Sequence, residues 1–279
     1  MTLSIITINY NNLEGLRRTI DSVLSQTWHD FEWIIIDGGS TDGSKELIEE
    51  TANKLAASDF NPLSYWCSEP DKGIYNAMNK GIKHCNGEYL NFMNSGDSFY
   101  DTHTLEKVFN IHHTAAILYG IMLRPNGEVN NKPNMKPVLR WYDFYWETLG
   151  HQAQFTHLTL LHKLGGFDET YPILADWNFN ALAISEYHAS HEFLPFVVAQ
   201  YEGGGLSDTP DMGKDLARIR KEVFLKKLGL ADRIDYIEKY QLNNSILKEY
   251  YIILNNKLSW FLYRLARKIA KIWHKTCKK

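Results

Sequence analysis

Strand-like and helix-like stretches alternate through the first hundred residues, and this alternation constrains the fold of the chain more than any other feature. Apolar runs typical of buried strands cover residues 3–8, 32–37, 63–69 and 88–94. Between them, apolar side chains recur at helical spacing, and the first helix follows Asn11 or Asn12 as N-cap. Repeated strand–helix units form parallel sheets with right-handed crossovers. The sequence therefore predicts an α/β fold.

Acidic residues follow three of these strands at the point where each strand ends. Asp37 closes the second strand, and Asp97 comes shortly after the fourth. After the third strand, either Glu69 or Asp71 holds the corresponding position. Ligands of parallel sheets bind beyond the carboxyl ends of the strands. We therefore expect a ligand site lined by acids at this edge of the sheet.

The loop IIIDGGSTDGS at residues 34–44 differs from the common phosphate-binding loops. A dinucleotide site needs Gly-x-Gly-x-x-Gly after the first strand, where this chain has NYNNLEG, and the P-loop motif is absent. A carboxylate at Asp37 would repel phosphate, but it can accept the N3–H of a uracil base. The diphosphate can then be held by a metal ion that is bound by another acid further along the chain.

The pattern is less regular after Asp97. We expect a helix near 104–110, a strand near 115–123 followed by the hairpin turn RPNGE, a helix starting near Ala175 and a strand at 192–201. The last third of the chain is helical and charged in character.

Charge and cysteine content limit the partners and the compartment. Residues 248–279 carry nine Lys/Arg and one acid, so +8 of a net charge of −3 lies there and −11 remains for the rest. An acidic body argues against nucleic acid as a partner of the whole protein. The three cysteines form no Cys-x-x-Cys pair, and no signal peptide or apolar run of about 18 residues is present. We expect a cytoplasmic protein with reduced thiols.

Several segments resemble family 2 glycosyltransferases with the GT-A fold. SIITINYNN (4–12), IIIDGGSTDGS (34–44), EPDKGIYNAMNKGI (69–82) and GEYLNFMNSGDSF (87–99) are similar to the nucleotide-binding half of that family. Residues 151–182 resemble its acceptor half, and GGGLS (203–207) resembles its closing segment. The resemblance implies a GT-A domain at 1–207, with a Rossmann-like, mostly parallel sheet flanked by helices. Its nucleotide-sugar half would be 1–100 and its acceptor half 101–207, with a helical extension at 208–279.

The resemblance also implies roles for individual residues. It implies that Thr7, Asn9, Asp37, Asp71 and Lys72 bind the donor, Asp97 binds Mn²⁺ or Mg²⁺, Asp176 is the catalytic base, and His151 and Trp177 lie on the acceptor side. The sequence departs from the family's Asp-x-Asp motif, because NSGD has Ser95 where the first acid often stands. Metal binding would then rest on Asp97, the diphosphate and water.

Each of these residues also has a structural explanation, which the sequence leaves open. Asp37 and Asp97 suit turns, and Asp176 suits the first turn of a helix, where the helix dipole favours negative charge. The others suit ordinary positions: a solvated lysine for Lys72, a hydrogen-bonded histidine for His151 and a core tryptophan for Trp177.

The expected function is that of an inverting glycosyltransferase of bacterial surface-polysaccharide synthesis. It would move a hexose-type sugar from a nucleotide-sugar, with UDP favoured over GDP, to a saccharide or lipid-linked saccharide acceptor. Two alternatives stay open. One is a non-catalytic nucleotide-sugar-binding subunit, which the reduced metal motif suggests. The other is a sugar-phosphate nucleotidyltransferase, although that class is expected to carry a glycine-rich, basic loop after its first strand.

A basic amphipathic helix is predicted for residues 247–275. Its apolar face contains Leu247, Tyr250, Leu254, Leu258, Phe261, Leu265, Ile269 and Ile272, with lysines and arginines beside it. Such a helix can lie in the surface of an anionic membrane, which would make the enzyme peripheral at the inner face of the cytoplasmic membrane. It can equally pack on the catalytic domain or in a dimer.

Flotation with liposomes separates these two explanations. The full-length protein should float with anionic liposomes at low salt, and removal of residues 247–279 should abolish flotation but leave UDP binding unchanged. A full-length protein that does not float under these conditions excludes the membrane role.

Overall fold

The computed structural model describes residues 1–124, 126–129, 136–141, 143–205 and 212–225. Met1–Lys227 form one compact unit, which contains all of these residues. The helix expected at 247–275 lies outside the described residues, as does most of the expected extension at 208–279. Within the described residues, no helix combines the length and the apolar character that crossing a membrane requires.

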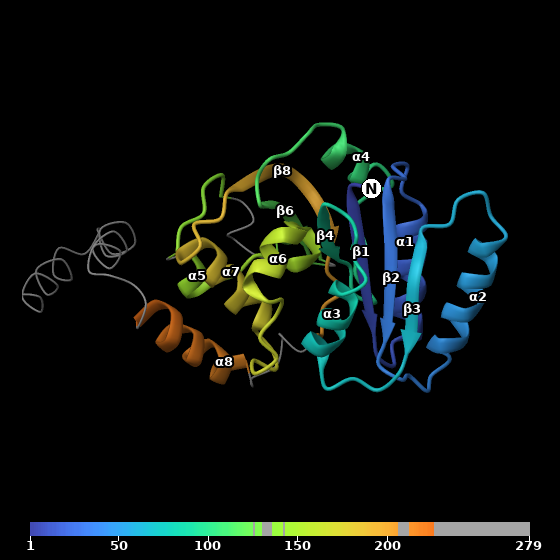
Figure 1. The fold of residues 1–279 in the computed structure, drawn as a ribbon, viewed down its shortest axis with the longest axis horizontal. Helices are drawn as coiled ribbons and strands as arrows, with labels where there is room; N and C mark the ends of the chain where they lie inside the picture. Colours follow the sequence, from blue (N-terminus) through green and yellow to red (C-terminus); the bar gives the residue numbers. More distant parts are fainter. Residues whose placement is uncertain (125, 130–135, 142, 206–211, 226–279) are drawn as a thin grey trace, which may run out of the picture. The chain divides into compact units, whose positions relative to one another are not determined.

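Residues 1–97, here called the nucleotide half after the role expected of residues 1–100, contain the predicted alternation of strands and helices. In chain order it has β1 (Leu3–Asn9), α1 (Leu13–Leu24), β2 (Phe31–Asp37), α2 (Ser44–Ala56), β3 (Leu63–Ser68), α3 (Ile74–Ile82) and β4 (Tyr89–Phe92) (Figure 1). The side chain of Asn12 caps α1 and accepts a hydrogen bond from the Gly15 N–H at 3.1 Å. β4 ends two residues earlier than predicted, so residues 93–97 form a loop beyond the strand.

The rest of the described chain, from β5 onward, is here called the acceptor half after the role expected of residues 101–207. It has β5 (Ser98–Phe99), α4 (Thr104–Phe109), β6 (Ile117–Leu123), α5 (Asp143–Trp146), η2 (His151–Ala153), β7 (Gln154–His157), α6 (Leu158–Leu164), α7 (Ala175–Ser185) and β8 (His191–Gln200), followed by α8 (Met212–Ile219) and the π-helix η4 (Arg220–Leu225). The predicted hairpin turn after β6 is confirmed by an antiparallel bridge between Leu123 and Val129.

One mixed sheet joins the two halves in the strand order β3-β2-β1-β4-β7-β6-β8-β5. The pairings β1–β2, β1–β4, β2–β3 and β6–β8 are parallel, whereas β4–β7, β6–β7 and β5–β8 are antiparallel. The nucleotide half is therefore entirely parallel, as predicted. The antiparallel strand β7 connects it to the acceptor half.

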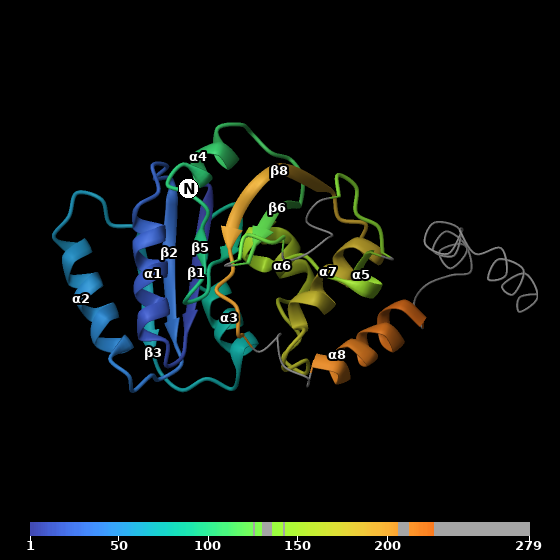
Figure 2. The ribbon, with the colours of Figure 1, turned by 180° about the vertical axis from the view of Figure 1, so that it is seen from behind.

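Helices cover both faces of the parallel strands, and these strands therefore carry apolar side chains on both faces. Figures 1 and 2 show α1 and α2 on one face and α3 on the other. Ile5 and Trp33 belong to the core on the side of α1 and α2. On the other side α3 lies close to β1, since a Cβ atom on Gly81 would come within 2.8 Å of the Ile6 side chain. The close packing of α3 fixes the residues at its N-terminal end relative to the strand ends.

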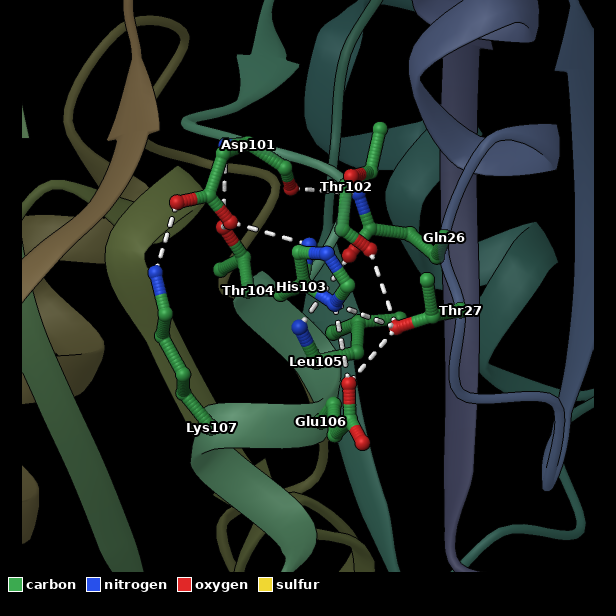
Figure 3. A network of polar contacts seen from close by, with 9 residues as sticks. All are labelled: Gln26, Thr27, Asp101, Thr102, His103, Thr104, Leu105, Glu106 and Lys107. Carbon is green, nitrogen blue, oxygen red and sulfur yellow. Dashed lines mark hydrogen bonds and ion pairs between the residues drawn. The ribbon is translucent and has the colours of Figure 1, made fainter.

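A polar network ties the end of α1 to the chain that follows β5 (Figure 3). The Gln26 side-chain amide donates to the Asp101 carbonyl at 2.8 Å and accepts from the Leu105 N–H at 3.1 Å. Thr27 donates to Glu106 at 2.9 Å, and Lys107 pairs with Asp101 at 2.6 Å. These contacts hold the segment 98–107 against α1, and with it the loop that precedes β5.

A buried carboxylate in β2 joins that strand to the turn before β4. Glu32 accepts hydrogen bonds from the Ser4 hydroxyl at 2.7 Å and from the Asn86 side chain at 3.2 Å. Burial by itself raises the pKa of Glu32, but the hydrogen bonds from Ser4 and Asn86 outweigh it and hold the pKa below the ordinary value of 4.5.

We expect Glu32→Gln to lower the free energy of unfolding by about 1.5–3 kcal/mol near neutral pH. The native carboxyl binds its proton less tightly than the unfolded one, so its stabilisation is present above the ordinary pKa and disappears as the pH falls through the lowered value. In urea unfolding, the difference between wild type and variant should shrink from about pH 7 to about pH 3. A constant difference would contradict this role. Glu49→Gln, at an exposed position of α2, is the control and should change stability by less than about 0.5 kcal/mol.

Candidate functional site

A large cleft lies beyond the carboxyl ends of β1 and β4, between residues of the two halves. Its volume of about 1120 Å³ exceeds the roughly 300–1,000 Å³ of ordinary small-molecule sites. The nucleotide half contributes Asn9, Tyr10, Asp71, Tyr75 and Asp97 to its lining, and the acceptor half contributes His151, Gln152, Asp176, Trp177 and Glu202. The cleft is therefore lined by polar side chains from both halves.

Asp37 is fully buried and is not a lining residue, although its neighbours Asn9 and Gly38 line the cleft. Its Oδ1 accepts from Asn9 Nδ2 at 2.7 Å and from the Ser40 hydroxyl at 2.6 Å, and its Oδ2 accepts from the Ser40 N–H at 2.9 Å and the Ser68 hydroxyl at 2.6 Å. Burial raises the pKa of Asp37, but these hydrogen bonds outweigh it and lower the pKa overall. The carboxylate is therefore ionised and already holds four donors.

The other residues predicted on the donor side lie at different depths. Thr7 is fully buried and accepts a hydrogen bond from the Trp33 indole at 3.0 Å, so it is not part of the cleft lining. Asp71 lines the cleft and pairs with Lys80 at 2.6 Å, a partner that the sequence did not reveal. Lys72 is exposed and is not among the lining residues.

Asp97 lies in the loop after β4 and is almost fully buried. Its Oδ2 accepts from the Gln152 amide at 2.7 Å, and its Oδ1 accepts from the Glu202 N–H at 3.0 Å. Burial raises the pKa of Asp97 to about 7, although the Gln152 bond and the nearby His151 act in the opposite direction. Within the described residues no lysine or arginine pairs with it. A buried carboxyl group without a lysine or arginine partner in the described residues is suited to bind a metal cation.

Glu202 covers the same loop and was not predicted as a site residue. A Cβ atom on Gly96 would lie only 1.7 Å from Glu202 Oε2, and Gly96 has a φ of +101°. The Glu202 carboxylate also pairs with Arg18 and accepts from Asn12 at 3.3 Å. The glycine of NSGD is therefore required both by its backbone conformation and by the carboxylate above it.

The loop fits a cation that is shared with a ligand. The described part of the chain has no group of three or more His, Cys, Asp or Glu side chains that could enclose a metal. Asp97 supplies a carboxylate, and the side-chain oxygen of Asn94 is buried without a hydrogen-bond partner. Oxygen donors of this kind suit Mg²⁺ or Mn²⁺, which take their remaining ligands from diphosphate and water.

Asp176 lies in the first turn of α7 and lines the same cleft as Asp97. Its Oδ1 accepts from the Tyr75 hydroxyl at 2.7 Å, and its Oδ2 lies 3.2 Å from His151 Nδ1. The other ring nitrogen of His151 lies 3.0 Å from Asn94 Nδ2. The sequence suggested Asp176 and His151 but not Tyr75 or Asn94, which are far from them in the chain. Their only sequence signal is their position in the segments that follow β3 and β4.

Trp177 adjoins the predicted base but is largely a core residue. Its side chain is 6% exposed, and its indole N–H donates to the Phe144 carbonyl at 2.6 Å. A bonded and buried indole matches the structural explanation given above for this residue. Trp177 is nevertheless among the residues that line the cleft.

Comparisons with known proteins agree with this geometry. The family model Glycosyl transferase family 2 matches residues 4–168. A PGL/p-HBAD biosynthesis glycosyltransferase of Mycobacterium bovis is 31% identical over 237 residues, which are 83% of this chain and 85% of that protein.

Solved structures show the same fold at lower sequence identity. TarS of S. aureus, in complex with UDP, superposes with a TM-score of 0.67 at 20% identity over 92% of this chain and 76% of its own. A mannosyltransferase from Pyrobaculum calidifontis, in complex with GDP-Man and Mn²⁺, superposes with a TM-score of 0.63 at 14% identity over 96% and 80%. The fold is thus of the GT-A type, and the chain belongs to glycosyl transferase family 2.

Proposed function

We propose that this chain is an inverting glycosyltransferase that moves a hexose-type sugar from a UDP-sugar to a saccharide or lipid-linked saccharide in surface-polysaccharide synthesis. The observation that supports it most is that Asp97 and Asp176, from opposite halves, line one cleft. One acid can serve the leaving group while the other serves the attacking hydroxyl. The enzyme would act in the cytoplasm, with the membrane surface as a further partner.

The donor would bind at the ends of β1 and β4. The complexes of TarS with UDP and of the archaeal mannosyltransferase with GDP-Man and Mn²⁺ support a nucleotide-sugar and a divalent cation. Asn9 and Asp71 line the donor side, whereas Asp37 would act mainly by holding Asn9 and Ser40 in place. A direct bond from uracil N3–H to Asp37 requires one of its four present donors to turn away.

Asp97 would hold Mn²⁺ or Mg²⁺ together with the diphosphate. When bound, the cation neutralises the negative charge that develops on the leaving nucleoside diphosphate. Gln152 and the Glu202 N–H keep the Asp97 carboxylate oriented, since each oxygen accepts one hydrogen bond and retains a lone pair.

Asp176 would be the general base. As the acceptor oxygen bonds to the anomeric carbon, its proton passes to the Asp176 carboxylate, and the bond from that carbon to the diphosphate oxygen breaks. Attack from the face opposite the leaving group in a single displacement inverts the anomeric configuration. The products are the glycosylated acceptor and the nucleoside diphosphate.

Two asparagine substitutions separate the proposed roles. Asp97→Asn should lose the part of UDP binding that depends on Mn²⁺, because an amide oxygen carries no charge for the cation. Asp176→Asn should retain that binding and lose turnover by at least about 100-fold, the usual contribution of a general base. Melting temperature with UDP, with and without Mn²⁺, reports binding; release of UDP from the UDP-sugar reports turnover. An Asp97→Asn protein with the full Mn²⁺ effect, or an active Asp176→Asn protein, contradicts the assignment concerned.

Asp37→Asn should affect both stability and donor binding. An amide in place of the carboxylate turns N–H groups toward donors such as Ser40 and Ser68, so we expect a loss of about 1.5–3 kcal/mol in unfolding free energy. UDP affinity should fall in parallel, since Asn9 and Ser40 lose their anchor. Unfolding in urea and titration with UDP measure the two effects. Unchanged UDP affinity would show that Asp37 serves the fold alone.

A further inference from the structure

The carboxylate of Asp176 is held on both oxygens. Oδ1 accepts from the Tyr75 hydroxyl at 2.7 Å and from the Trp177 N–H at 2.8 Å, and Oδ2 faces His151 Nδ1 at 3.2 Å. The side chain is only 14% exposed, so few orientations are open to it. Oδ2, which has the fewer bonds, is the oxygen with a lone pair available for an acceptor hydroxyl.

The contacts of His151 determine which of its nitrogens carries the proton. An ionised carboxylate 3.2 Å from Nδ1 requires a proton on that nitrogen. In the neutral ring Nε2 is then an acceptor, and it lies 3.0 Å from the amide nitrogen of Asn94, which is a donor. The two contacts agree on the Nδ1–H tautomer. With the proton on Nε2 instead, a ring lone pair would face the carboxylate.

Tyr75 bridges the base and the backbone in front of α7. Its hydroxyl lies 2.6 Å from the Ile173 carbonyl and 2.7 Å from Asp176 Oδ1, but it has one proton to donate. A bond to a charged acceptor is the stronger one, so the ionised carboxylate receives it. Burial, and after it the charge of Asp176, raise the pKa of Tyr75 well above its ordinary value. The phenol therefore stays a donor across the working pH range.

Two of the three supporting residues, Tyr75 and Asn94, come from the nucleotide half. Tyr75 is in the first turn of α3, directly after the segment EPDKG, and Asn94 is in the same loop as Asp97. Asp176 itself belongs to the acceptor half. The ionisable groups that face the cluster are Tyr75 from α3, His151 from η2 and Asp97 from the loop after β4, whose carboxyl is influenced by His151.

We propose that Tyr75 and His151 are positioning residues for Asp176, and that Asn94 selects the His151 tautomer that this role requires. The proposal rests on the assignment of Asp176 as the base. In consequence, the base takes part of its working orientation from the elements that are proposed to bind the donor. His151 donates its Nδ1–H to the carboxylate, and the acceptor's proton goes to Asp176.

The tautomer of His151 can be observed without any substrate. Long-range ¹H–¹⁵N spectra of the full-length protein distinguish Nδ1–H from Nε2–H, and His151→Asn identifies the signal. We expect the Nδ1–H form in the wild type, and a shift toward Nε2–H or a mixture in Asn94→Ala. A wild-type His151 in the Nε2–H form would overturn the assignment of His151 and Asn94.

Steady-state kinetics test the positioning role itself. The assay measures the release of UDP from UDP-GlcNAc, UDP-glucose and UDP-galactose in the presence of Mn²⁺. Tyr75→Phe and His151→Ala should lower kcat by roughly 10- to 100-fold, as misorientation of a catalytic group does, with donor KM within about twofold of the wild type. His151→Asn should recover part of the loss, because its amide nitrogen can occupy the position of Nδ1. Tyr171→Phe is the matched control, since that buried hydroxyl donates to Glu222 at 3.0 Å outside the cleft.

The possible results separate this inference from the proposed function. An inactive Asp176→Asn protein together with an unchanged kcat in Tyr75→Phe would overturn the role of Tyr75 and leave the base in place. Equal losses in His151→Ala and His151→Asn would overturn the role of His151. An active Asp176→Asn protein, or a wild type that turns over none of the three donors, would count against the proposed function, and the tautomer would still decide the role of His151.

Discussion

Carboxylates held out of water by neutral donors are the constraint on which the rest of this site depends. Asp37, Asp97 and Asp176 bond to hydroxyl, amide, imidazole and backbone N–H groups, and in the described part of the chain no lysine or arginine pairs with them. A buried charge is costly unless such donors surround it. Asp37 has four donors and its pKa is lowered, whereas Asp97 has two and burial raises its pKa to about 7. The number of donors thus distinguishes Asp37 from Asp97, the acid proposed to bind a cation.

The donors that hold these acids also join the two halves of the chain. Gln152 and Glu202 of the acceptor half bond to Asp97 of the nucleotide half, and Tyr75 of the nucleotide half bonds to Asp176 of the acceptor half. Each half therefore completes the polar site of the other. The antiparallel strand β7 between β4 and β6 gives this exchange a rigid basis, because it belongs to the sheet of both.

Sequence periodicity was sufficient to predict the strands and helices of the nucleotide half and the positions of its acids at the strand ends. Buried parallel strands with apolar residues on both faces leave a strong pattern, so β1, β2 and β3 were predicted to within one or two residues. The antiparallel strands were harder to predict from the sequence, because β5 has only two residues and β7 only four. Gln152, Tyr75 and Glu202 could not be predicted as site residues, because their partners are 55, 101 and 105 residues away and only the fold brings them together.

The position of Glu202 offers a physical explanation for why NSGD has one acid where the Asp-x-Asp motif has two. The Glu202 carboxylate lies over Gly96, where a Cβ atom would be 1.7 Å from Oε2, and its N–H bonds to Asp97. The loop therefore already has two acids beside it, one from its own sequence and one from the segment after β8. Asn12 Nδ2 contacts both the Ser95 carbonyl and Glu202 Oε2, so a further carboxylate at position 95 would add a like charge on the side of the loop that Glu202 covers. A serine there avoids that repulsion, and Arg18 and Asn12 balance the charge that Glu202 brings.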